Sequence, residues 1–285
     1  MPGRFAVSGA PLFHRSEQLV GADVMARLRE ARVILFGVGG VGSWCAEALV
    51  RSGVGHLALV DSDRVCITNV NRQVQALPET VGCFKVDALA DRLRRVNPDA
   101  DIRTHREAYG EDTAGTFGME SYDYVLDAID TLSRKLGLII QALSMGRKVY
   151  SSMSASARLD PTRVRVCSVW ETRDCPLARK IRKRLRHHGV TSDLTVVYSE
   201  ELLEDRGGAP VCGSAACHCP RFEVPEGAPG AGPGEWCSHK ASLNGSMMPV
   251  VATFGLTLAS LVLQDVFRLV NSQGAATLAP GHPAV

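Results

Sequence analysis

The chain has 285 residues, of which 45% are apolar, so it is long enough for one large domain with a substantial core. Its formal net charge is only +2, which by itself does not indicate a nucleic-acid-binding protein, so any basic surface must be local. The first residues lack the long apolar core of a signal peptide, and the nine cysteines do not form a small-domain disulfide framework, so we expect a cytoplasmic protein with reduced thiols or a metal site.

Strand-like and helix-like segments alternate through the first half of the chain. Strands are expected at 33–36, 56–61, 102–105, 122–127, 148–151, 164–169 and 194–198, and helices at 41–51, 80–96 and 131–145. Strands that are separated by helices imply a mainly parallel sheet with right-handed crossovers. The predicted class is therefore α/β, with helices flanking the sheet and an elaborated C-terminal part.

The second half is less regular. Residues 205–240 are rich in Gly, Pro and Cys and predict a long irregular loop. Residues 245–264 carry no charge, and their length matches a membrane span of ~20 residues. Because Pro249, Gly255 and Ser260 interrupt this run, we favour a helix at 249–270 that is buried in a globular core. The tail after Asn271 is expected to be loose.

The sequence GVGGVG follows the first predicted strand and opens a helix. Gly37, Gly39 and Gly42 have the G-x-G-x-x-G spacing, in which glycine lets the backbone approach a phosphate and the helix start offers free N–H groups. Asp61 ends the second strand, where a carboxylate can accept both hydroxyls of a ribose. This pattern predicts a nucleotide site, with a tight turn that binds nothing as the alternative. It is common to NAD-dependent oxidoreductases and ATP-dependent adenylating enzymes.

The segment after the second strand distinguishes these two classes. The stretch DSDRVCITNVNRQ and the helix that follows it place polar side chains close together, namely Asp61, Asp63, Asn69, Asn71, Arg72, Gln73 and Lys85. A triphosphate needs cations such as Arg72 and Lys85, because its charge must be neutralised as pyrophosphate leaves. Hydride transfer has no such need, so the segment favours ATP over NAD.

Two carboxylates follow the fourth predicted strand, in the sequence DAID. Asp127 ends the strand and Asp130 lies just beyond it, at the carboxyl edge of the sheet where ligands bind. Either could hold Mg²⁺ on bound phosphates, since Mg²⁺ uses few protein ligands. The alternative for Asp130 is an N-cap of the next helix. The proximity of Arg72 and Lys85 favours the metal role.

A strongly basic helix is predicted within residues 173–188, in the sequence RDCPLARKIRKRLRHH. Its cations are Arg173, Arg179, Lys180, Arg182, Lys183, Arg184 and Arg186. Leu177, Ile181 and Leu185 recur every four residues and are expected to face the core. We interpret the opposite face as a phosphate-binding surface, with a solvated helix face as the alternative.

Cysteines cluster in the irregular loop. They are Cys212, Cys217, Cys219 and Cys237, with two histidines beside them. Four thiols suit tetrahedral Zn²⁺, although the C-x₄-C-x-C spacing is not a standard knuckle. We interpret the cluster as a zinc site, and a loop of unrelated thiols and a catalytic thiol are the alternatives.

The motifs together resemble the ubiquitin-activating E1-like superfamily, which includes the ThiF and MoeB adenylating enzymes. The resemblance lies in GVGGVG, DSDRVCITNVNRQ, Lys85 and DAID. Within the superfamily, the chain is most similar to the tRNA threonylcarbamoyladenosine dehydratases, through FHRSEQLVG, VCITNVNRQVQAL, VLDAID, LDPTRVRV and VVYSEE. Some relatives that activate sulfur carriers have a four-cysteine zinc site with paired C-x-x-C spacing, which this chain lacks.

The resemblance implies an ATP-binding Rossmann-like fold and a reaction in which a substrate carboxylate becomes an acyl-adenylate. In the dehydratase branch the carboxylate belongs to threonylcarbamoyladenosine at position 37 of tRNA, and the activated carboxyl closes a ring with loss of water. The implied roles are ribose binding by Asp61, phosphate binding by Asn69, Arg72 and Lys85 beside Gly37, Gly39, Gly40 and Gly42, and Mg²⁺ binding by Asp130. Arg15 is implied to reach the ATP of a partner subunit.

The sequence thus predicts a homodimeric, cytoplasmic, ATP-dependent tRNA-modifying enzyme without stable membrane association. The alternative is adenylation of the C-terminal glycine of a ubiquitin-like sulfur carrier, and a cysteine desulfurase or other sulfur-acceptor system is a further candidate partner. The expected organisation is an N-terminal arm and helix (1–30), an adenylating domain (31–200), the cysteine loop (201–245), a helix that completes the domain (246–270) and a flexible tail (271–285).

Overall fold

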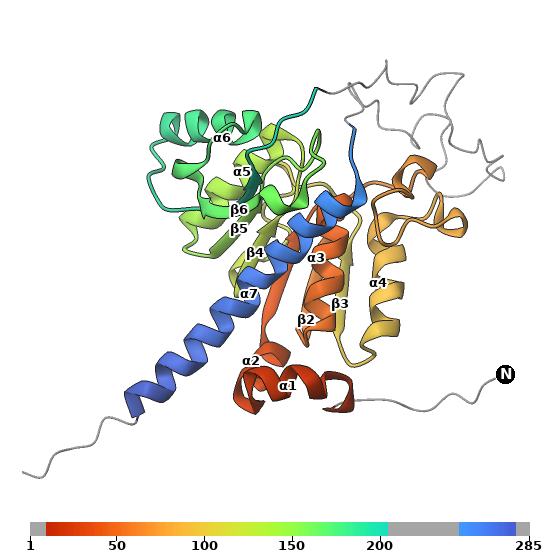
Figure 1. Ribbon diagram of the computed structural model, residues 1–285, viewed down its shortest axis with the longest axis vertical. Coiled ribbons are helices and arrows are strands. Elements are labelled where there is room, and N and C mark those ends of the chain that lie inside the picture. The colour runs from red at the N-terminus through yellow and green to blue at the C-terminus, as the bar shows by residue number, and fades with distance from the viewer. Residues whose placement is uncertain (1–9, 205–244, 278–285) are drawn as a thin grey trace, which may run out of the picture.

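The computed structural model describes residues 10–204 and 245–277, and it confirms the predicted α/β class (Figure 1). Seven strands form one sheet in the order β3-β2-β1-β4-β5-β7-β6. The strands are β1 Arg32–Phe36, β2 His56–Val60, β3 Asp101–His105, β4 Tyr124–Asp127, β5 Lys148–Ser152, β6 Val164–Ser168 and β7 Thr195–Ser199. All neighbouring strands are parallel except β6, which is antiparallel to β7.

Helices cover both faces of the sheet. They are α1 His14–Val20, α2 Ala22–Glu30, α3 Gly40–Arg51, α4 Lys85–Val96, α5 Leu132–Ser144, α6 Pro176–His187 and α7 Met248–Thr277. Side chains alternate along β1, so that Val33 and Leu35 pack toward α3, α4 and α7, whereas Ile34 and Phe36 pack toward α5 and α6. The sheet therefore carries a separate apolar layer on each face, and the loops at the carboxyl ends of the strands remain available for a site.

Two predicted helix ends were wrong by about one turn or more, and the other predicted bounds lie within about two residues of the observed ones. The helix expected at 80–96 begins only at Lys85, because Gly82 adopts a φ of +93° that a helix cannot contain. A short 3₁₀ turn, Pro78–Thr80, precedes it. The last helix, expected to end at 270 before a loose tail, continues to Thr277. Ala275 and Ala276 favour helix strongly, and the first proline after Asn271 is Pro280.

Helix α7 crosses α3 on the outside of the sheet (Figure 1). Residues 248–272 are long and apolar enough to span a membrane, yet half of their most apolar window is buried within the protein. The buried side chains include Phe254, Leu258 and Val262, at four-residue spacing. A side chain at Gly255 would overlap the carbonyl of Val41, so the two helix backbones approach each other closely. The packing agrees with the expected core helix over this part of α7.

The burial of α7 leads to a test with two variants on the same helix. Phe254→Ala should lower the free energy of unfolding by about 3–5 kcal/mol, because it leaves a cavity among packed helices. Leu256→Ala should change it by less than about 0.5 kcal/mol, because Leu256 is 49% exposed. Urea denaturation of the two proteins measures the difference. Equal losses in both variants would show that α7 does not pack as described.

Candidate functional site

The glycine turn joins β1 to α3. At Gly37 both the backbone conformation and the lack of space for a side chain require glycine. Gly37 has a φ of +84°, and a Cβ there would lie 2.8 Å from the carbonyl oxygen of Ala128. At Gly39, by contrast, the nearest atom to an added Cβ is 3.8 Å away, on Gln73. The space above the turn is therefore open, and the regular hydrogen bonds of α3 begin only where Ser43 N donates to Gly39 O. The preceding N–H groups of the first turn have the geometry of an anion site.

Asp61 is the first residue after β2 and is tied to the glycine turn. Its Oδ2 accepts a hydrogen bond from Val38 N at 2.8 Å, and its Oδ1 accepts one from Asp63 N at 2.8 Å. Burial raises the pKa of Asp61, and the nearby Lys85 and these backbone donors only partly oppose the shift. The carboxylate is thus fixed in orientation at the position expected for ribose binding.

Lys85 is 4% exposed and extends from the first turn of α4 toward two carboxylates. Its Nζ lies 2.6 Å from Asp63 Oδ2. Burial alone lowers the pKa of this amine, but Asp61, Asp63 and Asp130 reverse the direction, so the pKa is raised and the ammonium form is stabilised. A buried cation is therefore held beside the glycine turn.

The TNVNRQ loop lies against the glycine turn. An added Cβ at Gly40 would lie 3.6 Å from Arg72 Cγ, which places Arg72 beside the start of α3. Arg72 Nη1 donates to Thr68 O at 2.8 Å and to Asn71 Oδ1 at 3.0 Å. Asn69 is 2% exposed, and its Oδ1 accepts from Cys66 N at 2.9 Å, so this amide holds the loop in shape.

Asp130 is exposed and lies within electrostatic range of Arg72 and Lys85. Burial lowers the pKa of Arg72, and Asp130 only partly opposes this shift, whereas the pKa of Lys85 is raised with a contribution from Asp130. Asp130 does not cap the next helix, because the N-cap position of α5 belongs to Thr131 and no side chain caps it. Its Oδ1 accepts one hydrogen bond, from Thr131 Oγ1 at 3.3 Å. An exposed carboxylate among cations that would bind phosphate fits Mg²⁺, and so the residues present suit this ion.

Asp127 has no exposed surface and lies beneath the site. Its Oδ2 accepts from Lys135 Nζ at 2.6 Å and from Ser151 Oγ at 2.6 Å, and its Oδ1 accepts from Ile129 N at 3.0 Å. The carboxylate therefore fixes the backbone turn that leads to Asp130, and its complete burial keeps it away from a ligand in the open space above the turn. Its place at the strand end predicted direct contact with a nucleotide. The structure instead makes Asp127 a positioning residue, which acts through the backbone that it holds.

Lys135 was missed by the sequence reasoning. It is completely buried in α5, together with Ile139 and Ala142, which follow it by four and seven residues. A lysine in the apolar stripe of a helix is a signal that a buried carboxylate lies opposite.

Arg15 lies far from the glycine turn of its own chain. It is exposed on α1, and α1 begins beside Phe13, which approaches Gly53 just before β2. This is the amino edge of the sheet, about one strand length, ~16 Å, from the edge that carries the glycine turn. Figure 1 shows α1 and the start of α3 at opposite ends of the fold. Arg15 therefore cannot complete the site within one subunit.

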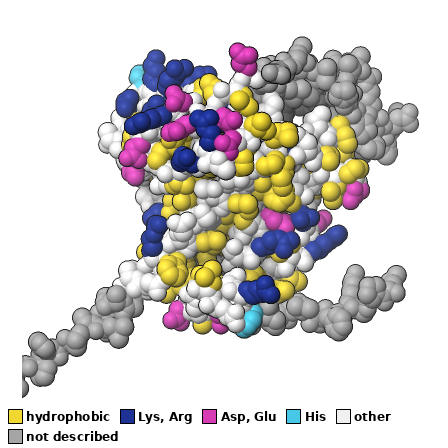
Figure 2. All heavy atoms as spheres, in the orientation of Figure 1, with side chains coloured by type: hydrophobic (Ala, Val, Ile, Leu, Met, Phe, Trp, Pro, Cys, Tyr) yellow, Lys and Arg dark blue, Asp and Glu magenta, His cyan; other side chains and the backbone are white. Residues whose placement is uncertain are grey.

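The predicted basic helix forms as α6 and buries Ala178, Ile181 and Leu185, with Leu177 partly buried. Lys and Arg side chains gather over it in Figure 2. Arg173, Arg179, Lys180, Lys183 and Arg184 form no ion pair within the described residues. These cations remain available to an anionic partner.

Arg182 was wrongly assigned to this available face. Its Nη1 donates to Thr172 O at 2.8 Å and contacts Thr172 Oγ1, so the side chain holds the turn before α6. Arg186 lies 5.3 Å from the centre of the Trp170 ring. Arg182 is therefore engaged within the protein, and the other cations of the segment 173–188 carry the predicted phosphate-binding surface, which stays a prediction.

The predicted zinc ligands Cys212, Cys217, Cys219 and Cys237 lie outside the described residues. Within residues 10–204 and 245–277, no group of three or more His, Cys, Asp or Glu side chains is arranged to hold a metal ion. The predicted zinc site stays a prediction.

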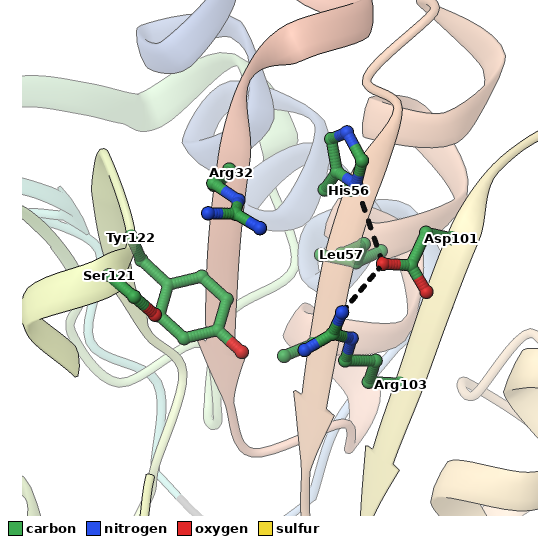
Figure 3. A pocket seen from close by; sticks show the side chains of 8 residues that line it. Arg32, His56, Leu57, Asp101, Arg103, Ser121 and Tyr122 are labelled. Carbon is green, nitrogen blue, oxygen red and sulfur yellow. Dashed lines mark hydrogen bonds and ion pairs between the residues drawn. The ribbon is translucent and has the colours of Figure 1, made fainter. Parts of the chain in front are cut away.

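A separate shallow pocket lies at the amino ends of β1, β2 and β3 (Figure 3). Arg32 and Tyr122 line one side, and His56 and Arg103 reach Asp101 at 3.4 and 3.2 Å on the other. The pocket is on the opposite edge of the sheet from the glycine turn, so it is not part of the nucleotide site.

Comparison with known proteins identifies similar chains over most of this one. The sequence profile of the ThiF family matches residues 13–279. The tRNA threonylcarbamoyladenosine dehydratase of Escherichia coli (strain K12) is 32% identical over 270 residues, which are 92% of this chain and 96% of that protein. The protein of the same name from Bacillus subtilis (strain 168) is 41% identical over 189 residues, 66% of this chain and 74% of that protein.

Solved structures agree with the sequence matches. The E. coli dehydratase in complex with ATP superimposes with a TM-score of 0.76 at 29% identity, over 92% of this chain and 96% of that one. The same enzyme in complex with AMP gives a TM-score of 0.75 at 28% identity, over 94% of this chain and all of that one.

The buried ion pair beneath the site leads to a prediction about stability. Lys135→Met should lower the free energy of unfolding by about 3–5 kcal/mol, because it leaves the Asp127 carboxylate buried without its cation. Lys148→Met is the matched control, since this lysine pairs with Asp265 at 2.9 Å but is 52% exposed, and it should cost about 1 kcal/mol or less. Urea denaturation at pH 7 measures both values. Similar losses in the two variants would contradict the role given to burial.

Proposed function

The chain belongs to the ThiF family, and we propose that it is an ATP-dependent tRNA threonylcarbamoyladenosine dehydratase. The observation that carries the proposal is the arrangement of Arg72, Lys85 and Asp130 around an open glycine turn, in a chain that aligns with the E. coli dehydratase over nearly its full length.

The proposed reaction has two steps. A carboxylate oxygen of the threonylcarbamoyl group attacks the α-phosphorus of ATP, and the bond from that phosphorus to the pyrophosphate oxygen breaks. The resulting acyl-adenylate is then attacked at its carbonyl carbon by a nucleophile of the same modification, and AMP leaves. A neighbouring nucleophile has a high effective concentration, so the second step needs positioning more than an enzyme nucleophile.

The residues of the site divide this work. Asp61, held by Val38 N and Asp63 N, accepts the ribose hydroxyls, and the first turn of α3 receives phosphate oxygens. Arg72 and Lys85 offset the charge that develops as pyrophosphate leaves. Asp130 would hold Mg²⁺, which supplies further charge neutralisation on the phosphates. Asn69 acts by holding the loop that carries Arg72.

The basic face of α6 favours tRNA over the C-terminal tail of a sulfur-carrier protein. Four cations on α6 and Arg173 just before it form no ion pair among the described residues, and such cations suit a phosphate backbone. Helix α6 lies toward the end of the fold where α3 begins (Figure 1). Pyrophosphate release from ATP in the presence of threonylcarbamoyladenosine-containing tRNA tests the proposal. Release with a ubiquitin-like carrier and none with tRNA would favour the sulfur-carrier alternative.

We also propose a cytoplasmic homodimer that binds no membrane stably, since half of the apolar window of α7 is covered by the fold. The position of Arg15 at the amino edge supports the dimer, because only a second subunit could bring this cation to a phosphate. We propose further that the cysteine loop binds a zinc ion. A cysteine desulfurase or a sulfur-acceptor system is also proposed as a partner.

A first functional prediction concerns Asp130. Asp130→Ala should reduce tRNA-dependent pyrophosphate release at least about a hundredfold, the usual size for loss of one preorganised electrostatic group. The fold should survive, because Asp130 is exposed and holds no element in place. The control is Glu79→Ala, which removes an exposed carboxylate from the 3₁₀ turn before α4 and should leave the rate unchanged. Tight binding of NAD(H) by the unaltered protein, with no response to ATP, would refute the adenylating reaction.

A second functional prediction concerns Arg15. Arg15→Ala should lose activity yet remain dimeric and folded, because the exposed side chain would act on the partner's ATP as an arginine finger does. Mixing this variant with Asp130→Ala should restore part of the activity, since one site in each heterodimer then has both residues. The rate after subunit exchange is the measurement. If the subunits exchange and no activity returns, Arg15 does not act across the interface.

A further inference from the structure

Two arginines lie against Phe84 at the rim of the nucleotide site. The guanidinium carbon of Arg64 is 3.9 Å from the ring centre and that of Arg106 is 4.9 Å from it. The three residues come from the loop after β2, the residue before α4 and the residue after β3. We refer to Arg64, Phe84 and Arg106 as the rim stack.

The rim stack and the phosphate-binding residues lie on opposite sides of one short ribbon. Arg64 and Phe84 are partners in an isolated antiparallel bridge, and Lys85 N donates to Asp63 O at 2.9 Å in the same ribbon. Consecutive residues of an extended ribbon point to opposite sides. Asp63 and Lys85 point into the site, where their side chains pair at 2.6 Å, and Arg64 and Phe84 lie on the other side of the ribbon, where the partly buried Phe84 also packs against the core.

Both guanidinium groups are held in place by neighbours. Arg106 Nε lies 2.9 Å from Asp87 Oδ2, and Arg64 Nη1 donates to Gly82 O at 2.9 Å. The Arg106 side chain is nevertheless 59% exposed. A planar cation that is fixed in orientation but open to solvent can accept a flat partner without a large loss of side-chain entropy.

We propose that the rim stack is a docking surface on which an unpaired nucleobase of the RNA substrate stacks. This inference rests on the proposed function. The substrate carboxylate must reach the α-phosphate within the site, so the nucleotides next to the modified one pass over its rim. Guanidinium planes and aromatic rings stack on exposed bases of single-stranded RNA loops. Asp87 offsets part of the charge of Arg106, so the planar shape of the side chain matters more than its charge.

The test measures binding of a fluorescein-labelled anticodon stem-loop that carries threonylcarbamoyladenosine, by fluorescence anisotropy. Arg106→Ala should raise the Kd about fivefold or more, the lower range for loss of one stacked base. Arg106→Lys should weaken binding nearly as much, because it keeps the charge and loses the plane. Phe84→Leu should act in the same direction, since it removes the surface that orients both arginines.

Arg103→Ala is the matched control. Arg103 lies on β3, three residues before Arg106, is 62% exposed and is paired with Asp101 at 3.2 Å, so its loss removes the same charge from a similar setting. It should change the Kd less than twofold, and the Kd for ATP should be unchanged in all four variants. Equal weakening by Arg106→Ala and Arg103→Ala, or full binding by Arg106→Lys, would overturn the stacking role.

The outcomes separate this inference from the proposed function. If the unaltered protein dehydrates modified tRNA and Arg106→Ala does so with the same KM, the function stands and the rim stack has no role in binding. If the unaltered protein binds no RNA, both are refuted.

Discussion

The contact between the glycine turn and the segment after β4 determines where every charged group of the site lies. Gly37 packs directly against the carbonyl of Ala128, so no side chain can separate β1 from β4 at this edge. The buried Asp127, held by Lys135 and Ser151, fixes the backbone on the other side of that contact. The open space above Gly39 and the position of Asp130 both follow from this packing.

The charges of the site are arranged in two layers that have different tasks. The lower layer is the ion pair of Asp127 and Lys135, which is completely buried. It holds the backbone at Ile129 in place. The upper layer has Asp61 and Asp63 close to Lys85, with Arg72 and Asp130 nearby. Burial disfavours the charged form of both Asp61 and Lys85. The opposite charge of each group therefore stabilises the charged form of the other.

The sequence predicted the parts of the site that come from one continuous segment. The glycine turn, Asp61 and the TNVNRQ loop are neighbours in the chain, and parallel strands bring their ends to one edge, so their proximity followed from spacing. Lys135 and Ser151 were not predicted, because their common partner Asp127 is reached only through the packing of α5 and β5 on β4. Arg182 resembled its neighbours on the basic helix, and only the turn at Thr172 shows that it is engaged. The late start of α4 depends on the φ of Gly82, which composition alone does not determine.

The packing of α7 on the glycine turn has a consequence for how the protein is made. Val251 lies against Gly40, and Gly255 fits against Val41, so the start of α3 is supported by residues about two hundred positions later in the chain. When the last strand of the sheet, β7, has been synthesised, α7 has therefore not yet been made. The nucleotide-binding end of the nascent domain stays incomplete until the last segment emerges, and the fold cannot mature strictly from its N-terminus onward.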